Sequence, residues 1–337
     1  MAAPEVQPKA KTRRVEVGRI RSASARVRRV DPRLYVVYVA FLLILVFFGI
    51  TLRDEGFLSS TNLLNIVKQT TPITVMAVGL VFVLSAGEID LSLGSVVALT
   101  SLVTALALRD YGLVAGIAAG LGVGVGVGLV NGLVVTLLRL PSFLVTLATM
   151  GLVAGLARWV TDLASVAVIN ETFANVFGSG SVGPVPSLVG WTLVVVGIGY
   201  FFFRHTRFGA HVVATGDNVA AARVTGIRVD RVKLSVLVLS GTMASLAGLL
   251  YAGRLQSGTY TLGESDLLPV IAAVVIGGTR LFGGAGSVVG ALIGSLIMGM
   301  LNNGLILMGL SASGQMIAQG VILLVAISLT LREPRGS

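Results

Sequence analysis

Cysteine is absent from the 337 residues, and histidine occurs only at His205 and His211. A chain without thiols forms no disulfide, no thiolate nucleophile and no cysteine-ligated metal site. Both histidines lie beside Arg207 in a basic stretch. That pattern is typical of a charged surface loop, so we predict no metal site.

Charged residues are also scarce, at 12% of the chain against 55% hydrophobic residues. This composition excludes an ordinary soluble domain and leaves no room for a sizeable soluble catalytic domain, so no enzymatic activity is predicted. Lysine occurs only at Lys9, Lys11, Lys68 and Lys233, and none of these follows a glycine. The chain therefore lacks the G-x-x-x-x-G-K-S/T loop that holds ATP phosphates, and an ATP-driven process would need another subunit.

Ionisable residues are almost missing from the interior of the apolar runs. Ion- and proton-coupled carriers use such residues as relays or ligands, so their scarcity argues against that class. Backbone carbonyls can also bind Na⁺, which keeps an ion-coupled carrier open as an alternative.

What the chain does have is ten apolar runs between about Leu34 and Thr330. About 20 apolar residues cross a bilayer as a helix, and inside lipid only helices or closed barrels satisfy their backbone polar groups. The runs are too long and too uniform for barrel strands. We therefore predict an all-α, polytopic integral membrane protein with a single transmembrane domain over residues 34–331. Its ten helices are expected near residues 34–52, 68–86, 94–108, 113–138, 142–160, 187–203, 234–252, 267–277, 287–308 and 315–331.

Positive charge is distributed unevenly around these runs. With the N-terminus inside, 20 lysines and arginines fall in the inner gaps and 5 in the outer gaps. Such a bias sets orientation, so the N-terminal tail (1–33) and the C-terminus (332–337) are predicted to be cytoplasmic. The net charge of +10 then reflects orientation rather than nucleic-acid binding. The basic tail is predicted to be a disordered arm that lies on anionic membrane lipid.

Two parts of the sequence form a weak internal repeat. Pro72 opens an apolar run that leads to the segment Gly87–Gly94 and then to Ser-Val-Val. Pro269 opens a second run that leads to the segment Gly277–Gly286 and again to Ser-Val-Val. Interrupted segments at matching places in two halves indicate a transport pathway. The alternative is coincidence in a chain rich in glycine and valine.

Glycines recur at every fourth position of the run 113–138. On a helix they form one smooth stripe that allows a neighbouring helix to approach closely. Gly122 and Gly126 are expected to widen this stripe, and the pairs Gly151 with Gly155 and Gly290 with Gly294 are expected to repeat it. The helix-packing glycines are Gly116, Gly120, Gly124 and Gly128.

A few polar residues within or beside the apolar runs are candidates for lining a pathway. Glu88, Asp90 and Ser92 are expected at the inner mouth, although capping of the helix that follows is an alternative for Asp90 and Ser92. Amide side chains in apolar helices either contact substrate or bridge helices by hydrogen bonds. These amides are Asn131, Asn302 and Asn303.

The basic segment 204–233 is the longest polar stretch after the tail. Gly216 and Asn218 suit a turn, with Asp217 or Asn218 as a helix cap. Val219–Thr225 is expected to form a short helix of small residues, ended by Gly226. A short helix of this kind suits docking into a groove of a partner. The alternative is an anchoring loop that only follows the charge bias.

Three segments together resemble one protein family. They are Gly87-Glu88-Ile89-Asp90-Leu91-Ser92-Leu93-Gly94-Ser95, the stretch 214–229, and Leu301-Asn302-Asn303-Gly304-Leu305. The chain is similar to the permease subunits of bacterial ABC importers for monosaccharides of the ribose, xylose and galactoside type, over about residues 60–331. One departure is Glu88, where many members carry glycine.

This resemblance implies a permease of the bacterial inner membrane that pairs with a second permease, expected to be another copy. An extracytoplasmic binding protein would deliver the sugar, and a cytoplasmic ATPase would hold ATP and Mg²⁺, so this chain would bind no cofactor. The stretch 214–229 would be the coupling helix that docks on the ATPase. The residues implied in coupling are Gly216, Asp217, Asn218, Ala220, Ala221, Ala222, Arg223 and Gly226.

Other functions stay open at this point. A related permease for branched-chain amino acids, nucleosides or a signalling furanose has a similar sequence pattern. An ion-coupled carrier would transport without an ATPase. A non-transporting membrane scaffold would have no pathway and would tolerate changes in 214–229.

Overall fold

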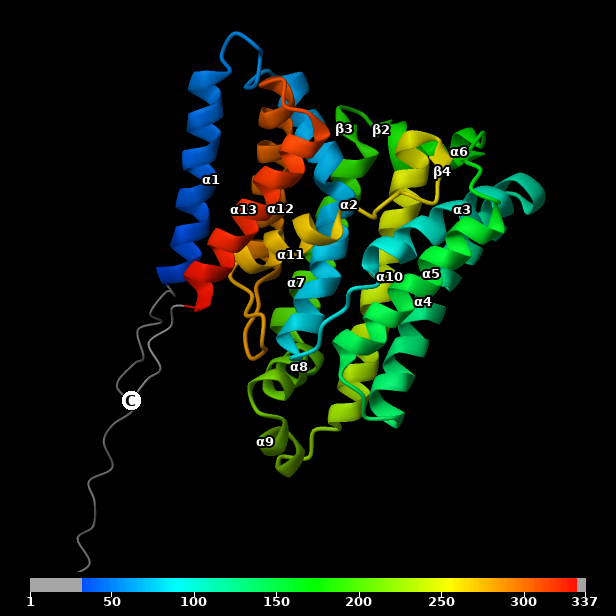
Figure 1. Ribbon diagram of the computed structural model, residues 1–337, viewed down its shortest axis with the longest axis vertical. Coiled ribbons are helices and arrows are strands. Elements are labelled where there is room, and N and C mark those ends of the chain that lie inside the picture. Colours follow the sequence, from blue (N-terminus) through cyan, green and yellow to red (C-terminus); the bar gives the residue numbers. More distant parts are fainter. Residues whose placement is uncertain (1–31, 332–337) are drawn as a thin grey trace, which may run out of the picture. The chain divides into compact units, whose positions relative to one another are not determined.

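The computed structural model describes residues 32–331 and is almost entirely helical (Figure 1). The basic tail and the C-terminal segment 332–337 lie outside the described residues, apart from the last two positions of the tail. The long helices are α1 (Pro32–Thr51), α2 (Ser60–Ser85), α3 (Leu93–Tyr111), α4 (Leu113–Leu137), α5 (Ser142–Val160), α7 (Ser187–His205), α10 (Val229–Leu255), α12 (Val288–Leu307) and α13 (Ala312–Leu331). The shorter ones are α6 (Glu171–Ala174), α8 (Arg207–Asp217), α9 (Val219–Val224) and α11 (Leu267–Ile276), and a π-helical turn covers Asn175–Ser179.

The prediction of an all-α membrane protein is confirmed, and a helix stands at each of the ten predicted places. The count of ten membrane spans is not confirmed. Among the described residues, seven helices are long and apolar enough to cross a membrane, and α11 is a shorter apolar helix. The ten residues of α11 rise about 15 Å, which is about half of a bilayer core.

Some predicted boundaries were wrong for local reasons. Helix α2 begins at Ser60 rather than residue 68, because the Ser59 side chain accepts a hydrogen bond from the Asn62 N–H and caps the helix. Pro72 lies inside α2, as it does in the predicted range 68–86. The second wrong boundary is the start of α10, which lies at Val229 rather than at residue 234. Lys233 therefore belongs to a helix and not to the loop.

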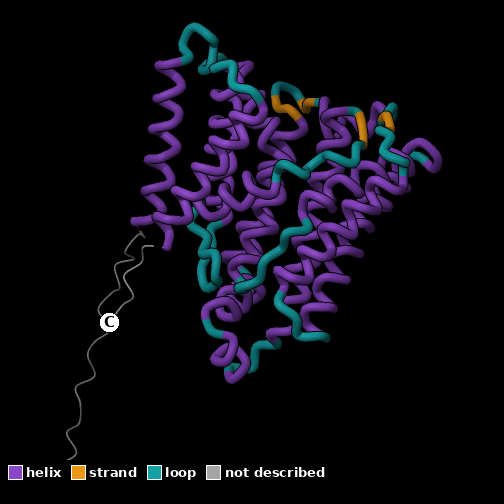
Figure 2. The backbone as a smooth tube through the Cα atoms, viewed as in Figure 1, coloured by secondary structure: helices purple, strands orange, loops and turns teal. Residues whose placement is uncertain are grey.

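The connections gather at two ends of the bundle. Two pairs of two-residue strands lie at the end opposite α8 and α9 (Figure 2). There β1 (Val166–Ala167) pairs antiparallel with β4 (Ser257–Gly258), and β2 (Ser181–Val182) pairs with β3 (Val185–Pro186). The segments around residues 85, 216 and 284 contact one another at the other end, here called the loop end. The distribution of lysine and arginine predicts that these three segments lie on the same side of the membrane, and in the structure they contact one another.

The glycine stripe of α4 lies against two neighbouring helices. Gly124 and Gly128 are buried against α10, where an added Cβ at Gly124 would overlap the carbonyl oxygen of Gly241. Gly116 and Gly120 instead leave space for the side chains of Leu108 and Thr104 of α3. The stripe therefore lets α4 approach the backbone of α10 and the side chains of α3 closely.

The expected widening of the stripe was wrong. An added Cβ at Gly122 or Gly126 meets nothing within 4 Å, and the same holds at Gly151 and Gly155. A spacing of two residues turns about 200° around a helix, so Gly122 and Gly126 face away from the stripe. The pair Gly290 and Gly294 does pack closely, against Gly277 and Ala273.

These two faces of α4 give a matched test. Gly124→Ala is expected to lower the free energy of unfolding by about 1–3 kcal/mol, because the overlap forces α4 and α10 apart. Gly126→Ala is expected to be neutral or to stabilise by up to about 1 kcal/mol, since alanine favours the helix over glycine. Melting of the purified protein in detergent measures both. Equal shifts for the two variants would contradict this account of the packing.

Candidate functional site

The segment 204–233 folds into two short helices joined at Asn218. The Thr206 hydroxyl accepts a hydrogen bond from the Gly209 N–H and caps α8, at 3.4 Å. The Asn218 side-chain oxygen accepts one from the Ala221 N–H and caps α9, at 3.0 Å. Helix α9 ends at Val224, and Gly226 follows with a φ of +86°, a backbone conformation that favours glycine. The cap at Asn218 and the glycine stop are as predicted, but Gly216 lies in the last turn of α8 rather than in a turn.

Most of the residues predicted to couple to an ATPase are exposed. Ala220 and Ala221 lie on the open face of α9, whereas Ala222 is buried, at 3% exposure. Arg223 forms an exposed ion pair with Asp230 at 3.1 Å. Small side chains on a short exposed helix leave a smooth surface for another protein to contact.

Gly216 faces the opposite way, into the bundle. An added Cβ there would overlap the carbonyl oxygen of Ser85, the last residue of α2, and would crowd the amide nitrogen of Gly284. The Gly284 N–H donates to that same Ser85 carbonyl at 3.1 Å. Gly283, with φ of +92°, also lies against the Gly216 backbone. The end of α8, the end of α2 and the loop between α11 and α12 therefore meet backbone to backbone, and we call this contact the glycine junction.

The junction joins the two parts of the weak repeat. The segment that follows Ser85 belongs to the first copy, and Gly283 and Gly284 belong to the second. Both contact the same turn of α8. The turn of α8 that carries Gly216 is therefore packed directly on both segments, with no space between the backbones.

An ion pair connects Glu88 to the segment 204–233. Its carboxylate is buried, at 5% exposure, and forms an ion pair with Lys233 in the second turn of α10. A buried carboxylate is stable only when a partner compensates it. The pair links the segment after α2 to the helix that follows α9.

Asp90, Ser92 and Asn131 form a buried cluster, each at 1% exposure. Asp90 accepts hydrogen bonds from the N–H and the hydroxyl of Ser92, at 2.9 and 2.6 Å. The amide of Asn131 on α4 donates to the Ser92 hydroxyl at 3.1 Å. These contacts fix the segment before α3 to α4. Ser92 precedes α3 but its side chain makes no capping hydrogen bond.

The two neighbouring asparagines of α12 differ in their surroundings. Asn303 exchanges two hydrogen bonds with Asn62 of α2, at 2.9 and 3.0 Å, and bridges the helices. Asn302 instead lines a cavity of about 220 Å³, and its side-chain oxygen is buried without a hydrogen-bond partner among the described residues. Buried polar atoms without a partner are uncommon in folded proteins, which makes Asn302 a candidate for contact with a bound molecule.

The cavity lies between α2, α11, α12 and α13, and several polar side chains stand among its lining residues. Gln69, Gln315 and Gln319 contribute amides to its wall, and Asp266 contributes a carboxylate just before α11. Asp266 accepts a hydrogen bond from the Tyr251 hydroxyl at 2.6 Å. Burial raises the pKa of Asp266 above its ordinary value, although Tyr251 and Arg254 act in the opposite direction. Apart from Asn302, the sequence reasoning missed this site.

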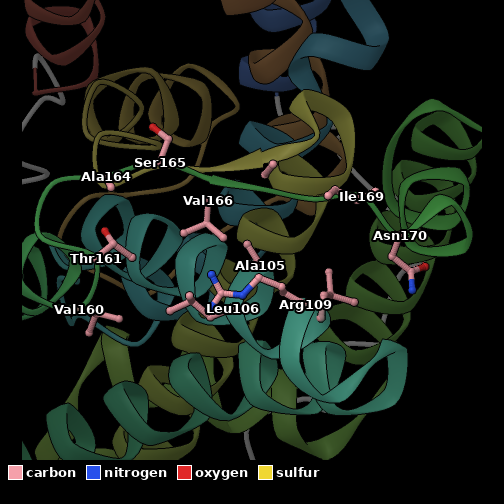
Figure 3. Close-up of a pocket in the computed structure, with 12 residues that line it drawn as sticks. Ala105, Leu106, Arg109, Val160, Thr161, Ala164, Ser165, Val166, Ile169 and Asn170 are labelled. Atoms are coloured by element: carbon pink, nitrogen blue, oxygen red, sulfur yellow. The ribbon is translucent and has the colours of Figure 1, made fainter.

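A larger cavity of about 650 Å³ lies between the end of α3 and the segment 160–170. Figure 3 labels Arg109 and Val166 among the residues that line it. Its charged and amide side chains already have partners, since Arg109 bonds Asp110 at 2.7 Å and the Asn170 oxygen accepts from the Phe173 N–H and caps α6. The hydroxyl of Thr161 also lines this cavity and has no hydrogen-bond partner among the described residues.

Comparison with known proteins decides the family. Residues 62–327 match the family described as branched-chain amino acid transport system / permease component. The chain belongs to this permease family. It is a multi-pass membrane protein of the bacterial inner-membrane type, and a comparison with solved structures finds no match for the permease.

Several relatives of the permease are sugar transporters by name. The ribose import permease protein of Escherichia coli K12 is 41% identical over 292 residues, which is 85% of this chain and 90% of that protein. The ribose import permease protein of Bacillus subtilis is 39% identical, over 87% of this chain and 91% of the relative. The xylose transport system permease protein of Escherichia coli K12 is 32% identical, over 92% and 95%. The resemblance to monosaccharide permeases is thereby confirmed.

Proposed function

We propose that this chain is the membrane subunit of an ATP-binding-cassette importer and forms the pathway for a monosaccharide, a pentose or hexose, by alternating access. The observation that carries the proposal is its similarity to a ribose import permease over 85% of this chain and 90% of the relative. The match covers most of both proteins, so the similarity extends over the membrane helices and is not limited to one short motif.

The polar cavity supports a neutral, hydroxyl-rich solute. Amide side chains donate and accept hydrogen bonds and suit hydroxyl groups, while a sugar needs no fixed counter-charge in the membrane. An amino acid would require groups that compensate its ammonium and its carboxylate. Asp266 is the one acidic group and no basic group is among the lining residues of this cavity, so a zwitterion fits it less well.

The loop end supports docking of a separate ATPase. On this proposal α9 enters a groove on the ATPase, which holds ATP and Mg²⁺, and this chain binds no nucleotide or other cofactor. The charge bias favours a cytoplasmic loop end and cytoplasmic termini. A second copy of the permease completes the pathway, and an extracytoplasmic sugar-binding protein approaches the end with the short strands.

Movement of α9 would reach the pathway through the glycine junction and the Glu88–Lys233 pair. When the ATPases close on ATP, the docked loops shift α8 and the segments packed on it. The cavity then opens to one side of the membrane and closes to the other. ATP drives this change because it binds more tightly to one of the two conformations of the transporter than to the other.

Transport assays with the whole complex test the proposal. Vesicles containing the permease, its ATPase and its binding protein should take up labelled pentose or hexose when ATP is supplied on the ATPase side. Unlabelled ribose or xylose should compete, and leucine or a nucleoside should not. Uptake of leucine or of a nucleoside in place of the sugar would overturn the substrate assignment.

The two neighbouring asparagines give a matched prediction. Asn302→Ala should slow sugar uptake about tenfold, because a lost hydrogen bond of about 1.4 kcal/mol corresponds to that factor, and should leave the melting temperature unchanged. Asn303→Ala should instead lower the free energy of unfolding by about 1 kcal/mol, because it breaks the bridge to Asn62. If Asn302→Ala transports at the normal rate, the cavity is not part of the pathway.

A further inference from the structure

An apolar groove runs along the surface of the bundle between α7 and α10. Both helices pack against α2, and Val78 and Phe82 of α2 lie among the residues that line the groove, which has a volume of about 620 Å³. Ile198 on its wall is 55% exposed although fully apolar. Side chains of this kind at the membrane surface contact lipid rather than water.

The length of the groove matches one leaflet of a bilayer. On α7 its lining extends from Trp191 to Phe202, which is about 16 Å along a helix. On α10 it extends from Leu234 to Leu246, about 18 Å. Half of a bilayer core is about 15 Å. Phe202 and Leu234 lie beside the loop 204–233, so the groove covers the leaflet at the loop end.

A basic cavity continues the groove at that end. It has a volume of about 320 Å³ and shares Phe208 and Ser235 with the groove, and its wall includes His211, Arg228 and Arg231. The nearby carboxylate of Asp230 is paired with Arg223 on α9. Within residues 32–331 no ion pair joins a carboxylate to Arg228 or Arg231. Two uncompensated guanidinium groups therefore face this cavity.

We propose that the groove and the basic cavity together bind one anionic phospholipid of the leaflet at the loop end. One acyl chain would lie along α7 and α10, and the phosphate would contact Arg228, Arg231 and His211. Basic pockets between helices at a membrane surface favour such headgroups, and arginine binds phosphate through paired N–H groups.

The arrangement favours a phospholipid over the other possible occupants. A second permease copy would cover the apolar groove but would leave the guanidinium groups unpaired. A soluble ATPase would reach the arginines but not the apolar lining. Gly226, which follows α9, also lines the basic cavity, so the lipid would support the coupling helix from the membrane side. This inference does not depend on which solute is transported.

Lipid retention by the full chain tests the proposal. The purified permease in detergent is mixed with phosphatidylglycerol or with phosphatidylcholine of the same acyl chains, and bound lipid is counted by native mass spectrometry. Phosphatidylglycerol should stay bound and phosphatidylcholine should not. The double variant Arg228→Gln with Arg231→Gln should bind phosphatidylglycerol about 25-fold more weakly, because each arginine near an anionic headgroup contributes about fivefold.

Two further variants separate the parts of the site. Arg139→Gln removes an exposed arginine at the same end that lines neither cavity, and it should bind phosphatidylglycerol like the unchanged chain. Ile198→Trp fills the groove from its exposed side and should lose the lipid while the melting temperature is kept. Equal retention of the two lipids, displacement by inorganic phosphate alone, or a change of oligomeric state instead of lipid loss with Ile198→Trp would each overturn the proposal.

Discussion

Gly216→Leu is expected to abolish sugar uptake and to destabilise the protein. A Cβ at this position overlaps the Ser85 carbonyl and crowds Gly284, and neither is the end of a flexible side chain. The overlap must push α8 away from α2 and from the loop between α11 and α12, at a cost of about 3 kcal/mol. Uptake in vesicles and melting in detergent measure the two effects.

Ala221→Leu is the matched control for that variant. Ala221 is exposed on α9, so the added side chain overlaps nothing within this chain, and the melting temperature should be unchanged. Its effect should be on the ATPase, which should bind more weakly or hydrolyse ATP without uptake. Normal uptake by Gly216→Leu, or the same loss of stability in both variants, would show that the glycine junction does not carry the motion.

Breaking the Glu88–Lys233 pair should have the second large effect. Glu88→Gln leaves Lys233 partly buried, at 24% exposure, without its partner. Lys233→Met leaves a buried carboxylate without compensation, so it should cost more, about 3–5 kcal/mol of unfolding free energy. Transport should fall in both variants, since the segment after α2 is no longer held to α10. The reversed pair, Glu88→Lys with Lys233→Glu, should recover part of the stability, which a double-mutant cycle measures.

A second ion pair in the same loop provides the control. Arg223 and Asp230 are 60% and 65% exposed, so Asp230→Asn should cost less than about 1 kcal/mol. If Glu88→Gln and Lys233→Met are as mild as Asp230→Asn, the buried pair contributes no more than an ordinary surface contact. It would then have no part in holding the pathway segment to the loop.

Local chemistry explains which features the sequence predicts well. The cap at Asn218 and the stop at Gly226 depend only on residues within one helical turn, so the sequence contains all the information needed. The stripe of Gly124 and its neighbours follows from the helical period in the same way. The error at Gly122 and Gly126 came from treating nearby glycines as one face, although the helical period places them on the opposite side.

Contacts between distant segments explain what the sequence does not show. Glu88 lies between α2 and α3 and Lys233 lies on α10, so no local pattern pairs them. Gly216 suits a turn as well as a close contact, and only the packing against Ser85 decides between the two. The polar cavity combines Gln69 of α2 with Asp266, Asn302 and Gln319 from three later segments, so its residues appear unrelated along the chain. The short length of α11 likewise depends on how the bundle packs, because the hydropathy of a segment does not show how far it extends across the membrane.

The most direct test of the account is to ask what drives transport. Proteoliposomes containing the purified permease alone should show no sugar flux under a Na⁺ or proton gradient. Adding the ATPase and the binding protein should produce flux only when ATP is present on the side of loop 204–233. Sugar flux through the permease alone, driven by a cation gradient, would contradict the claim that this chain is a pathway moved by a separate ATPase.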